Sequence, residues 1–415
     1  MSARSGNIKF HIDVNSAFLS WSAICLLESG SKIDLRTVPS IVGGDQKTRH
    51  GIVVAKSIPA KQYGIHTADT VASAFQKCPA LISVKPDHSY YRRKSRELMD
   101  YLRNICPRIQ QVSIDECYMD FEPIRSQYPS PEAAARFICD GVLNTLGFTV
   151  NVGISDRKVL AKMASDFEKP NKVHTLYSSE IKEKLWPLPI GTLYMCGRKS
   201  AERMEQVGIS TIGDLAVAER SRIMSLFKSH GNLLWCYANG IDDSKVETAA
   251  REAKSIGNST TLPEDVVSRD QALPVLDRLV DSVSTRLKKH CFLAGQLTVE
   301  IKYSSFRSVS HQMPLDMPTS NKEALLKNAV QLFDELWDGS PVRLLGIRTG
   351  KFQKEGAPYQ INLFDYQSEL AKQERQKVKG DKHKKELERK KQLEDAIGKI
   401  EKKYGSGFIT KGITK

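Results

Sequence analysis

Two acidic residues stand side by side in an otherwise apolar segment, VSIDECYMDF, at residues 112–121. Burying one unpaired carboxylate is costly, and the adjacent carboxylates of Asp115 and Glu116 also repel each other. Asp13 ends another strand-like segment, KFHIDV, just before a helical pattern begins, and Asp120 is a further candidate. If these acids converge on one face of a sheet, divalent cations must balance their charge.

Magnesium suits such a site, because it prefers oxygen ligands and binds substrate phosphates. Two ions about 4 Å apart can hold both the attacking and the leaving oxygen of an in-line phosphoryl displacement. The acids therefore favour nucleotidyl transfer. One alternative stays open at this point, because acidic residues are also common in hairpin turns and spacing alone does not bring Asp13 to Asp115.

Phosphate groups need hydrogen-bond donors as well as metal ions. The helix expected to start at Asn15 or Ser16 offers free backbone N–H groups directly after Asp13. Lys61, in SIPAKQYGI, and Lys169, in DFEKPN, are candidate partners for the same phosphates. Each of these lysines, taken singly, is more typical of a solvated surface position.

The composition describes a large, basic chain. Its 415 residues, 40% of them hydrophobic, suffice for two to four domains with sizeable cores. The net charge is +14, and half of it lies in residues 366–415, which hold 15 Lys and Arg against 8 Asp and Glu. Because the rest of the chain is basic too, a polyanionic partner such as nucleic acid is favoured over a mere gain in solubility.

Targeting and redox features are few. No apolar run of about 18 residues occurs, so no transmembrane helix is expected, and the N-terminus lacks the apolar region of a signal peptide. The eight cysteines are irregularly spaced without a C-x-x-C pair, which predicts free thiols rather than a zinc site or disulfides. A soluble, cytoplasmic protein is expected.

The chain divides into segments of different character. Strand and helix patterns alternate in the first part, a mixed α/β unit whose last helix is expected over 157–170. Short helices punctuated by glycine follow over 177–243. A polar linker over 244–253 leads to a second α/β unit over 254–356, and a charged tail covers 366–415.

Four motifs, in their order and spacing, resemble the Y-family translesion DNA polymerases, with the bacterial DinB/UmuC-type branch closest. They are HIDVNSAFLSW, VSIDECYMDF, NVGISDRKVLAKMASDFEKPNKVHTL and QINLF, and the resemblance covers about 1–365. It implies an α/β (α+β) multidomain fold shaped as a right hand, with palm, fingers, helical thumb and an α/β little finger. The implied boundaries are palm 1–18 and 84–176, fingers 19–83, thumb 177–243, linker 244–253 and little finger 254–356.

The resemblance also implies roles for the acids. Asp13, Asp115 and Glu116 correspond to the catalytic residues that bind two Mg²⁺ ions, with the carbonyl group of Val14 as a backbone ligand. Glu116 would lie nearest the primer 3′-hydroxyl group.

The same resemblance implies a nucleotide site. Lys169 would contact the triphosphate, and Phe18, next to Ala17, falls at the steric-gate position, where a bulky ring excludes a ribose 2′-hydroxyl; without the motif, Phe18 would be read as a core aromatic. Many members carry a tyrosine and an arginine on the fingers, where this chain has Ile58 and Lys61. Lys61 keeps the charge without the guanidinium fork, and Ile58 cannot donate the tyrosine hydrogen bond.

Two further motifs imply binding partners. The segment MCGRKSAERMEQVGI resembles a helix-hairpin-helix whose Gly197, Arg198 and Lys199 would meet DNA phosphates, although Met195 replaces the first glycine and a plain surface hairpin stays an alternative. Residues 360–364, QINLF, resemble a sliding-clamp-binding peptide, in which Gln360 would hydrogen-bond while Leu363 and Phe364 fill an apolar groove.

Together these features predict an error-prone translesion DNA polymerase, acting as a monomer in DNA damage tolerance and repair. Its expected partners are primer–template DNA, dNTPs and the sliding clamp, with no membrane, and no stretch remains for a proofreading exonuclease. Two alternatives stay open: a non-catalytic factor that binds DNA and the clamp, and a nucleotide cyclase built on a similar palm.

Overall fold

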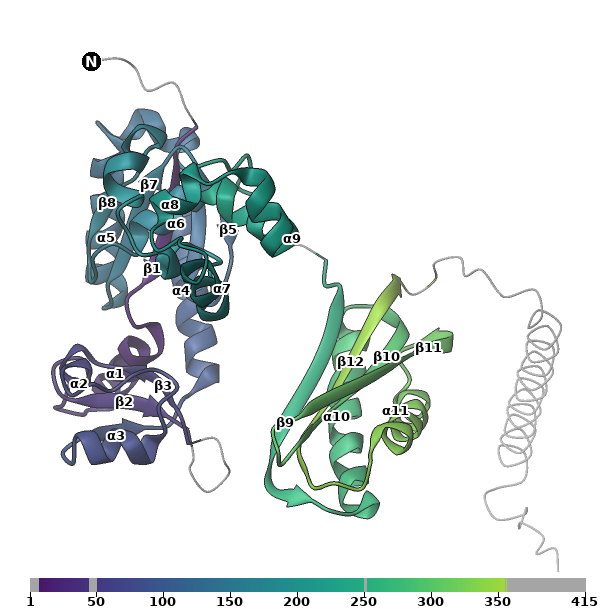
Figure 1. Cartoon of the computed structure of the whole chain (residues 1–415). Coiled ribbons are helices and arrows are strands. Elements are labelled where there is room, and N and C mark those ends of the chain that lie inside the picture. Colours follow the sequence, from purple (N-terminus) through teal and green to yellow (C-terminus); the bar gives the residue numbers. More distant parts are fainter. Residues whose placement is uncertain (1–6, 45–50, 250–251, 355, 357–415) are drawn as a thin grey trace, which may run out of the picture.

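A computed structural model describes residues 7–44, 51–249, 252–354 and 356 (Figure 1). The first part of the chain contains a five-stranded sheet in the order β5-β6-β1-β7-β8 and a three-stranded sheet in the order β3-β2-β4. The five-stranded sheet and its helices comprise β1 (Lys9–Val14), α1 (Ala17–Glu28), α4 (His88–Ile105), β5 (Ile109–Gln111), β6 (Glu116–Asp120), α5 (Pro131–Leu146), β7 (Val150–Ser155), α6 (Lys158–Ser165) and β8 (Val173–Thr175). The three-stranded sheet and its helices comprise β2 (Ser40–Gly43), β3 (Val53–Lys56), α2 (Ile58–Gln62), α3 (Val71–Lys77) and β4 (Ile82–Val84).

Along β1, apolar side chains on one face of the strand alternate with polar side chains on the other. Phe10, Ile12 and Val14 point into a core shared with α1, α4 and α5. Because successive side chains of a strand face opposite sides, His11 and Asp13 lie on the other face, which α6 covers. The polar residues of the first strand are therefore collected under one helix.

Helix α6 lies unusually close to the sheet because Gly153, on β7, has no side chain. A Cβ atom added there would lie 2.0 Å from the carbonyl oxygen of Ala161 and 2.5 Å from the backbone nitrogen of Ser165. The helix ends at Ser165, so the expectation of one helix over 157–170 was wrong at its C-terminal end. Pro170 disfavours helical geometry in the residue before it, and Lys169 consequently lies in a loop.

The segment after β8 is helical and shares its core with α6. It comprises the short turns Ser178–Glu180, Ile181–Leu185 and Ile190–Thr192, and the helices α7 (Arg198–Glu205), α8 (Ile212–Val217) and α9 (Arg220–Ala238). The turn of helix at Glu122–Gln127 belongs to the first sheet unit.

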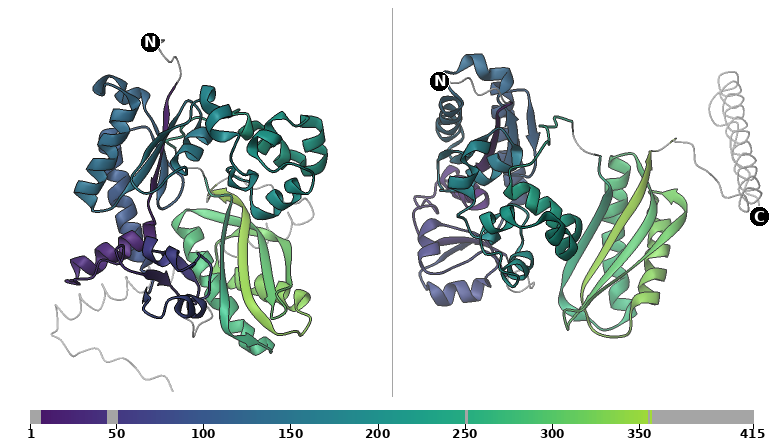
Figure 2. Two further views of the ribbon diagram at one scale, coloured as in Figure 1. Left: turned by 60° about the vertical axis from the view of Figure 1, so that its left-hand side comes forward. Right: turned by 45° about the horizontal axis from the view of Figure 1, so that its top comes forward.

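A separate antiparallel sheet in the order β11-β10-β12-β9 forms the C-terminal unit (Figure 2). Its elements are β9 (Ser255–Val266), α10 (Arg269–Lys289), β10 (Phe292–Tyr303), β11 (Ser308–Thr319), α11 (Lys322–Leu336) and β12 (Val342–Lys354). Both helices pack on the same face of this sheet and bury a second large core. The expected mixed α/β architecture of several units is confirmed. Across the described residues, none of the helices combines the length and hydrophobicity needed to cross a lipid bilayer.

Candidate active site

The register of two strands, β1 and β6, brings the predicted acids together. Asp13 on β1 lies directly opposite Glu116, the first residue of β6. The backbone N–H of Val14 donates to the carbonyl oxygen of Asp115 over 3.1 Å. Asp115 and Glu116 do sit at a hairpin turn, as the alternative reading of the sequence held, but this turn ends beside Asp13.

Asp120 does not belong to this group, and the expectation that it could join the other acids was wrong. It lies at the far end of β6, opposite Lys9, four residues beyond Glu116. Its carboxylate accepts a hydrogen bond from Arg108 over 3.2 Å and caps the turn at Glu122. Asp120 is therefore a structural residue of the sheet.

Two lysines balance part of the negative charge at the site, and a histidine contacts one of the acids. Lys169 forms an ion pair with Asp13, and Lys162, on α6, lies 3.1 Å from the Glu116 carboxylate. The buried His11 places its Nε2 atom 3.3 Å from the same carboxylate. Lys162 and His11 were not expected from the sequence, although both fall within motifs that carry the family resemblance.

These contacts set the protonation of the acids in opposite directions. The hydrogen bond from His11, together with the charge of Lys162, lowers the pKa of Glu116 to about 2. Burial raises the pKa of Asp115, and the nearby charges of Asp13 and Glu116 raise it further. Burial also lowers the pKa of His11, so its ring is neutral near pH 7 and donates to Glu116.

Asp115 is the one acid of the three that has no cationic partner within the described ranges. Its carboxylate accepts a 2.6 Å hydrogen bond from the Ser113 hydroxyl. No group of three His, Cys, Asp or Glu side chains in this part of the chain is already arranged to hold a metal ion. The donor chemistry nevertheless fits a hard divalent cation, because the carboxylates of Asp13, Asp115 and Glu116 supply only oxygen ligands and one of them lacks a counter-charge.

A cationic pocket of about 370 Å³ opens beside Asp13. It is lined by Asn15 and Ser16 at the start of α1, by Thr149 before β7, and by Lys61 and Lys169. The two lysines proposed from separate motifs therefore reach one cavity. The first turn of α1 adds backbone N–H groups that a helix leaves without internal partners.

Two further cations line this pocket that the sequence did not single out, Arg36 and Lys56. Arg36 is bound to Asp34 and donates to the carbonyl oxygen of Gly147 over 2.7 Å, so its charge is already used. Lys56 forms no ion pair among the described residues, although its ammonium lies 3.4 Å from the Thr67 hydroxyl. Burial and the charge of Lys61 lower its pKa, and the charge of Asp69 opposes this shift. The sequence does not mark Lys56 as a candidate site residue, because a lysine at the end of a short strand is ordinary.

Phe18 is held rigidly by other aromatic rings. Its ring stacks on Tyr91 at a centroid distance of 4.7 Å and meets His88 edge-on at 6.1 Å. Ala17 is buried at the start of α1. Neither Phe18 nor Ala17 lines the cationic pocket, whereas Ile58 does and is 58% exposed.

The remaining predicted contacts lie elsewhere. Gly197 precedes the first turn of α7, where Arg198 and Lys199 are exposed. Met195 adopts a positive φ of 70°, the geometry that favours the glycine it replaces. Residues 360–364, with Gln360, Leu363 and Phe364, and the tail 366–415 lie outside the described residues.

We expect Asp115→Asn to raise the free energy of unfolding of the metal-free protein at pH 7 by about 1 kcal/mol, because it removes a carboxylate whose ionisation is disfavoured. Because folding raises the pKa of this carboxyl group, its ionisation destabilises the fold fully above the raised pKa and not at all below the pKa of the unfolded state. The gain should therefore vanish as the pH falls below about 4. Mg²⁺ should raise the melting temperature of the parent but not of Asp115→Asn.

Scanning calorimetry in EDTA and in Mg²⁺ checks this expectation. Asp120→Asn is the matched control, because Asp120 lies in the same strand outside the acid group, and it should keep the Mg²⁺ shift. A metal-dependent shift that persists in Asp115→Asn, or a loss of stability in EDTA, would contradict the assignment.

Comparison with known proteins agrees with this architecture. The impB/mucB/samB family matches residues 12–166, and the impB/mucB/samB family C-terminal domain matches residues 253–363. A DNA polymerase IV of Clostridium acetobutylicum is 40% identical over 404 residues, covering 97% of each chain. The DNA polymerase IV 1 of Bacillus subtilis is 36% identical over 409 residues, covering 98% of this chain and 93% of the relative.

A solved Y-family DNA polymerase chimera of Dbh and Dpo4 shares the fold. Its TM-score is 0.73 at 21% sequence identity, and the match covers 84% of this chain and all of the chimera. With the sequence matches along nearly the whole length, the chain belongs to the impB/mucB/samB family, in the DinB-type branch of the Y-family DNA polymerases.

Proposed function

We propose that this chain, a DNA-directed DNA polymerase of the translesion class, performs its chemistry at Asp13, Asp115 and Glu116. The primer 3′-hydroxyl oxygen attacks the α-phosphorus of an incoming dNTP, and the bond to the leaving pyrophosphate breaks. The observation that carries this proposal is the pairing of Asp13 with Glu116 next to a pocket lined by lysines. Acids for metal ions and cations for phosphates are the two parts that nucleotidyl transfer requires.

We propose for the domains of the hand the boundaries that the family resemblance implies. The palm comprises 1–18 and 84–176, and the fingers comprise 19–83. The thumb is 177–243, and the little finger, 254–356, follows the linker 244–253. One helix complicates the first boundary, because α1 contributes both to the core under the five-stranded sheet and to the core of the fingers.

The family depends on divalent metal ions, and we propose two Mg²⁺ ions here. The carboxylates of Asp13, Asp115 and Glu116 and the carbonyl group of Val14 would hold them. When bound, such ions lower the pKa of the primer hydroxyl and balance the charge on the leaving pyrophosphate. Lys162 and His11 keep Glu116 ionised and oriented, and Lys169 can exchange its contact with Asp13 for one with the triphosphate.

The incoming nucleotide would lie between the acids and the cationic pocket. Lys61, Lys169 and the N-terminal turn of α1, which includes Ala17, would receive its phosphates. Phe18 would lie beneath the sugar, and its stack on Tyr91 leaves the ring little freedom to move away from a ribose 2′-hydroxyl.

A primer-extension assay with Mg²⁺ tests the function. The parent should extend a primer with dNTPs, including past an abasic template base, while Asp115→Ala should not. Phe18→Ala should keep dNTP extension and gain ribonucleotide incorporation by at least about tenfold, the effect of losing a steric clash of about 1.4 kcal/mol. No extension by the parent would favour a non-catalytic factor, and product from ATP without primer or template would favour a cyclase.

We propose that Lys56 compensates for the two positions on the fingers, 58 and 61, at which this chain differs from many family members. Because Ile58 offers no hydroxyl and Lys61 offers one ammonium in place of a guanidinium fork, a second ammonium in the pocket restores phosphate binding. Lys56→Met should raise the KM for dNTPs by about tenfold with little change in DNA affinity, as expected for one lost hydrogen bond to a charged group. Lys56→Arg should recover most of the loss.

Steady-state kinetics at saturating DNA measures this effect. Lys32→Met, an exposed lysine that does not line the pocket, should leave the KM unchanged. Equal KM values for the parent and Lys56→Met would remove Lys56 from the nucleotide site.

The partner proposals concern the thumb and the C-terminal peptide. Gly197, Arg198 and Lys199 would contact DNA phosphates without reading bases. Gln360, Leu363 and Phe364 would bind the sliding clamp, and Leu363→Ala with Phe364→Ala should abolish co-purification with the clamp while basal extension persists. Persistent co-purification would disprove the peptide assignment.

We further propose that the protein is a monomer, which size-exclusion chromatography checks. We also propose that it acts on the nucleoid in the cytoplasm, which fluorescence microscopy checks.

A further inference from the structure

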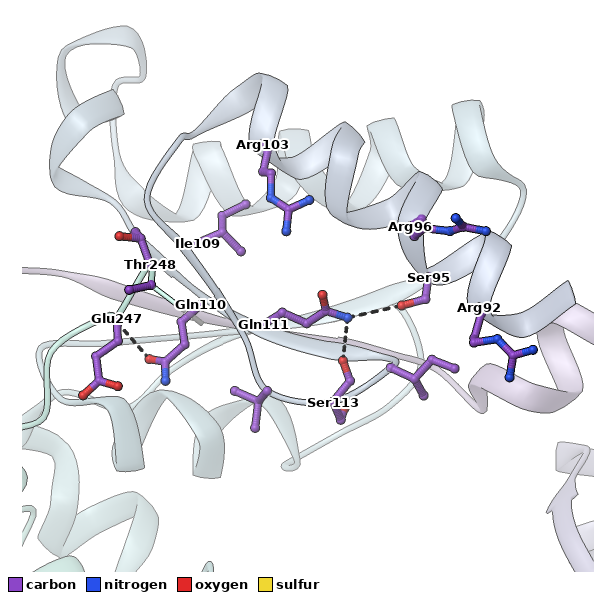
Figure 3. A pocket seen from close by; sticks show the side chains of 13 residues that line it. Arg92, Ser95, Arg96, Arg103, Ile109, Gln110, Gln111, Ser113, Glu247 and Thr248 are labelled. Carbon is purple, nitrogen blue, oxygen red and sulfur yellow. Dashed lines mark hydrogen bonds between the residues drawn. The ribbon is translucent and has the colours of Figure 1, made fainter. Parts of the chain in front are cut away.

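A second and larger cavity lies beside the acids but takes no part in the site described so far. Its volume is about 1000 Å³, and it opens between α4, the edge strand β5, the turn 112–114 and residues 247–249 (Figure 3). Gln110, on β5, anchors one wall, because its side-chain oxygen accepts the backbone N–H of Glu247 over 3.1 Å. We call this cavity the α4 groove.

Three arginines of α4 give the groove a strong positive charge. Arg92, Arg96 and Arg103 all line it, and Figure 3 shows their side chains along the helix that borders it. Arg103 is paired with Asp100 at 3.1 Å. Arg92 and Arg96 have no acidic partner among the described residues, so their charges remain available to a ligand.

Only one side of α4 faces the groove, as the neighbouring Arg93 shows. Its guanidinium group lies 4.6 Å from the centre of the Tyr90 ring and 3.9 Å from Glu97, and it does not line the groove. The same helix therefore carries exposed arginines that face the groove and one that does not.

Apart from the three arginines and one acid, Glu247, the lining residues are neutral. The Gln111 amide donates to the carbonyl oxygen of Ser113 over 2.9 Å and lies 3.4 Å from the Ser95 hydroxyl. Val112 is 46% exposed at the rim. Cations for phosphates, neutral donors and an apolar contact for sugars are the combination found where proteins bind a nucleic-acid backbone.

The position of the groove indicates which of the two DNA strands it binds. In the sheet order β5-β6-β1-β7-β8, the acids lie on β1 and at the start of β6. The pocket for the triphosphate lies on the β1 and β7 side, whereas the groove lies on the β5 side and reaches Ser113 and Ile114, directly before Asp115. In-line displacement places the attacking and leaving oxygens on opposite sides of the phosphorus. The primer strand, whose 3′-hydroxyl oxygen is the nucleophile, therefore arrives from the side of the groove.

We propose that the α4 groove binds the sugar–phosphate backbone of the primer strand behind its 3′ end. This inference rests on the proposed function and adds to it a second anion site, built from Arg92, Arg96 and Arg103. The eleven helical steps from Arg92 to Arg103 span about 16 Å of helix, which corresponds to about five nucleotides of a duplex strand. The contact is independent of base sequence.

The experiment measures DNA binding as a function of salt with fluorescently labelled primer–template. Loss of two phosphate contacts in Arg92→Gln with Arg96→Gln should make the slope of log K against log[KCl] shallower by about 1.8. Arg93→Gln is the matched control and should keep the parental slope. The KM for dNTPs at saturating DNA should not change in either variant.

Methylphosphonate substitution then identifies the strand. Neutralising primer phosphates two to five positions from the 3′ end should weaken binding to the parent but add nothing in the double variant, because the same contacts are already lost. Neutralising the matching template phosphates should weaken both proteins equally. A parental salt slope in the double variant, or additive effects on the primer strand, would overturn the proposal, even if extension and its loss in Asp115→Ala stand.

Discussion

Mutual repulsion among three carboxylates is the constraint on which the rest of the structure depends. Asp13, Asp115 and Glu116 come from two adjacent antiparallel strands, and their pairing is fixed by the register of a buried sheet. Such a group costs free energy unless positive charge is supplied. Lys162 and Lys169 supply part of it, and the unpaired Asp115 shows where more is needed.

The surrounding elements follow from this need. Gly153 lets α6 approach the sheet closely enough for Lys162 to reach Glu116, and the early end of that helix leaves Lys169 in a loop beside Asp13. Lys169 also lines the pocket with Lys56 and Lys61, so one side chain connects the acids with the proposed phosphate site. In the proposed mechanism stability and function compete, because the same repulsion that weakens the metal-free fold would give the site its affinity for cations.

Much of this site was accessible from the sequence, for a physical reason. Acids in apolar strand segments violate the hydrophobic pattern, so Asp13, Asp115 and Glu116 stand out, and the motif around Lys169 implies a role for it by resemblance. Lys56, Arg92 and Arg96 break no pattern, because lysine and arginine at strand ends and on helix surfaces are ordinary. Only their positions in the lining of two cavities distinguish them: Lys56 lines the cationic pocket, and Arg92 and Arg96 line the α4 groove. Asp120 was misjudged because the sequence does not reveal which end of a strand lies near the active site.

The most direct measurement is anomalous diffraction from crystals of the protein with primer–template DNA, a non-hydrolysable dNTP and Mn²⁺. The account predicts metal peaks among the carboxylate oxygens of Asp13, Asp115 and Glu116, with the Lys169 ammonium moved from Asp13 to the triphosphate. Peaks remote from these oxygens, or a Lys169 still paired with Asp13 beside a bound nucleotide, would contradict it.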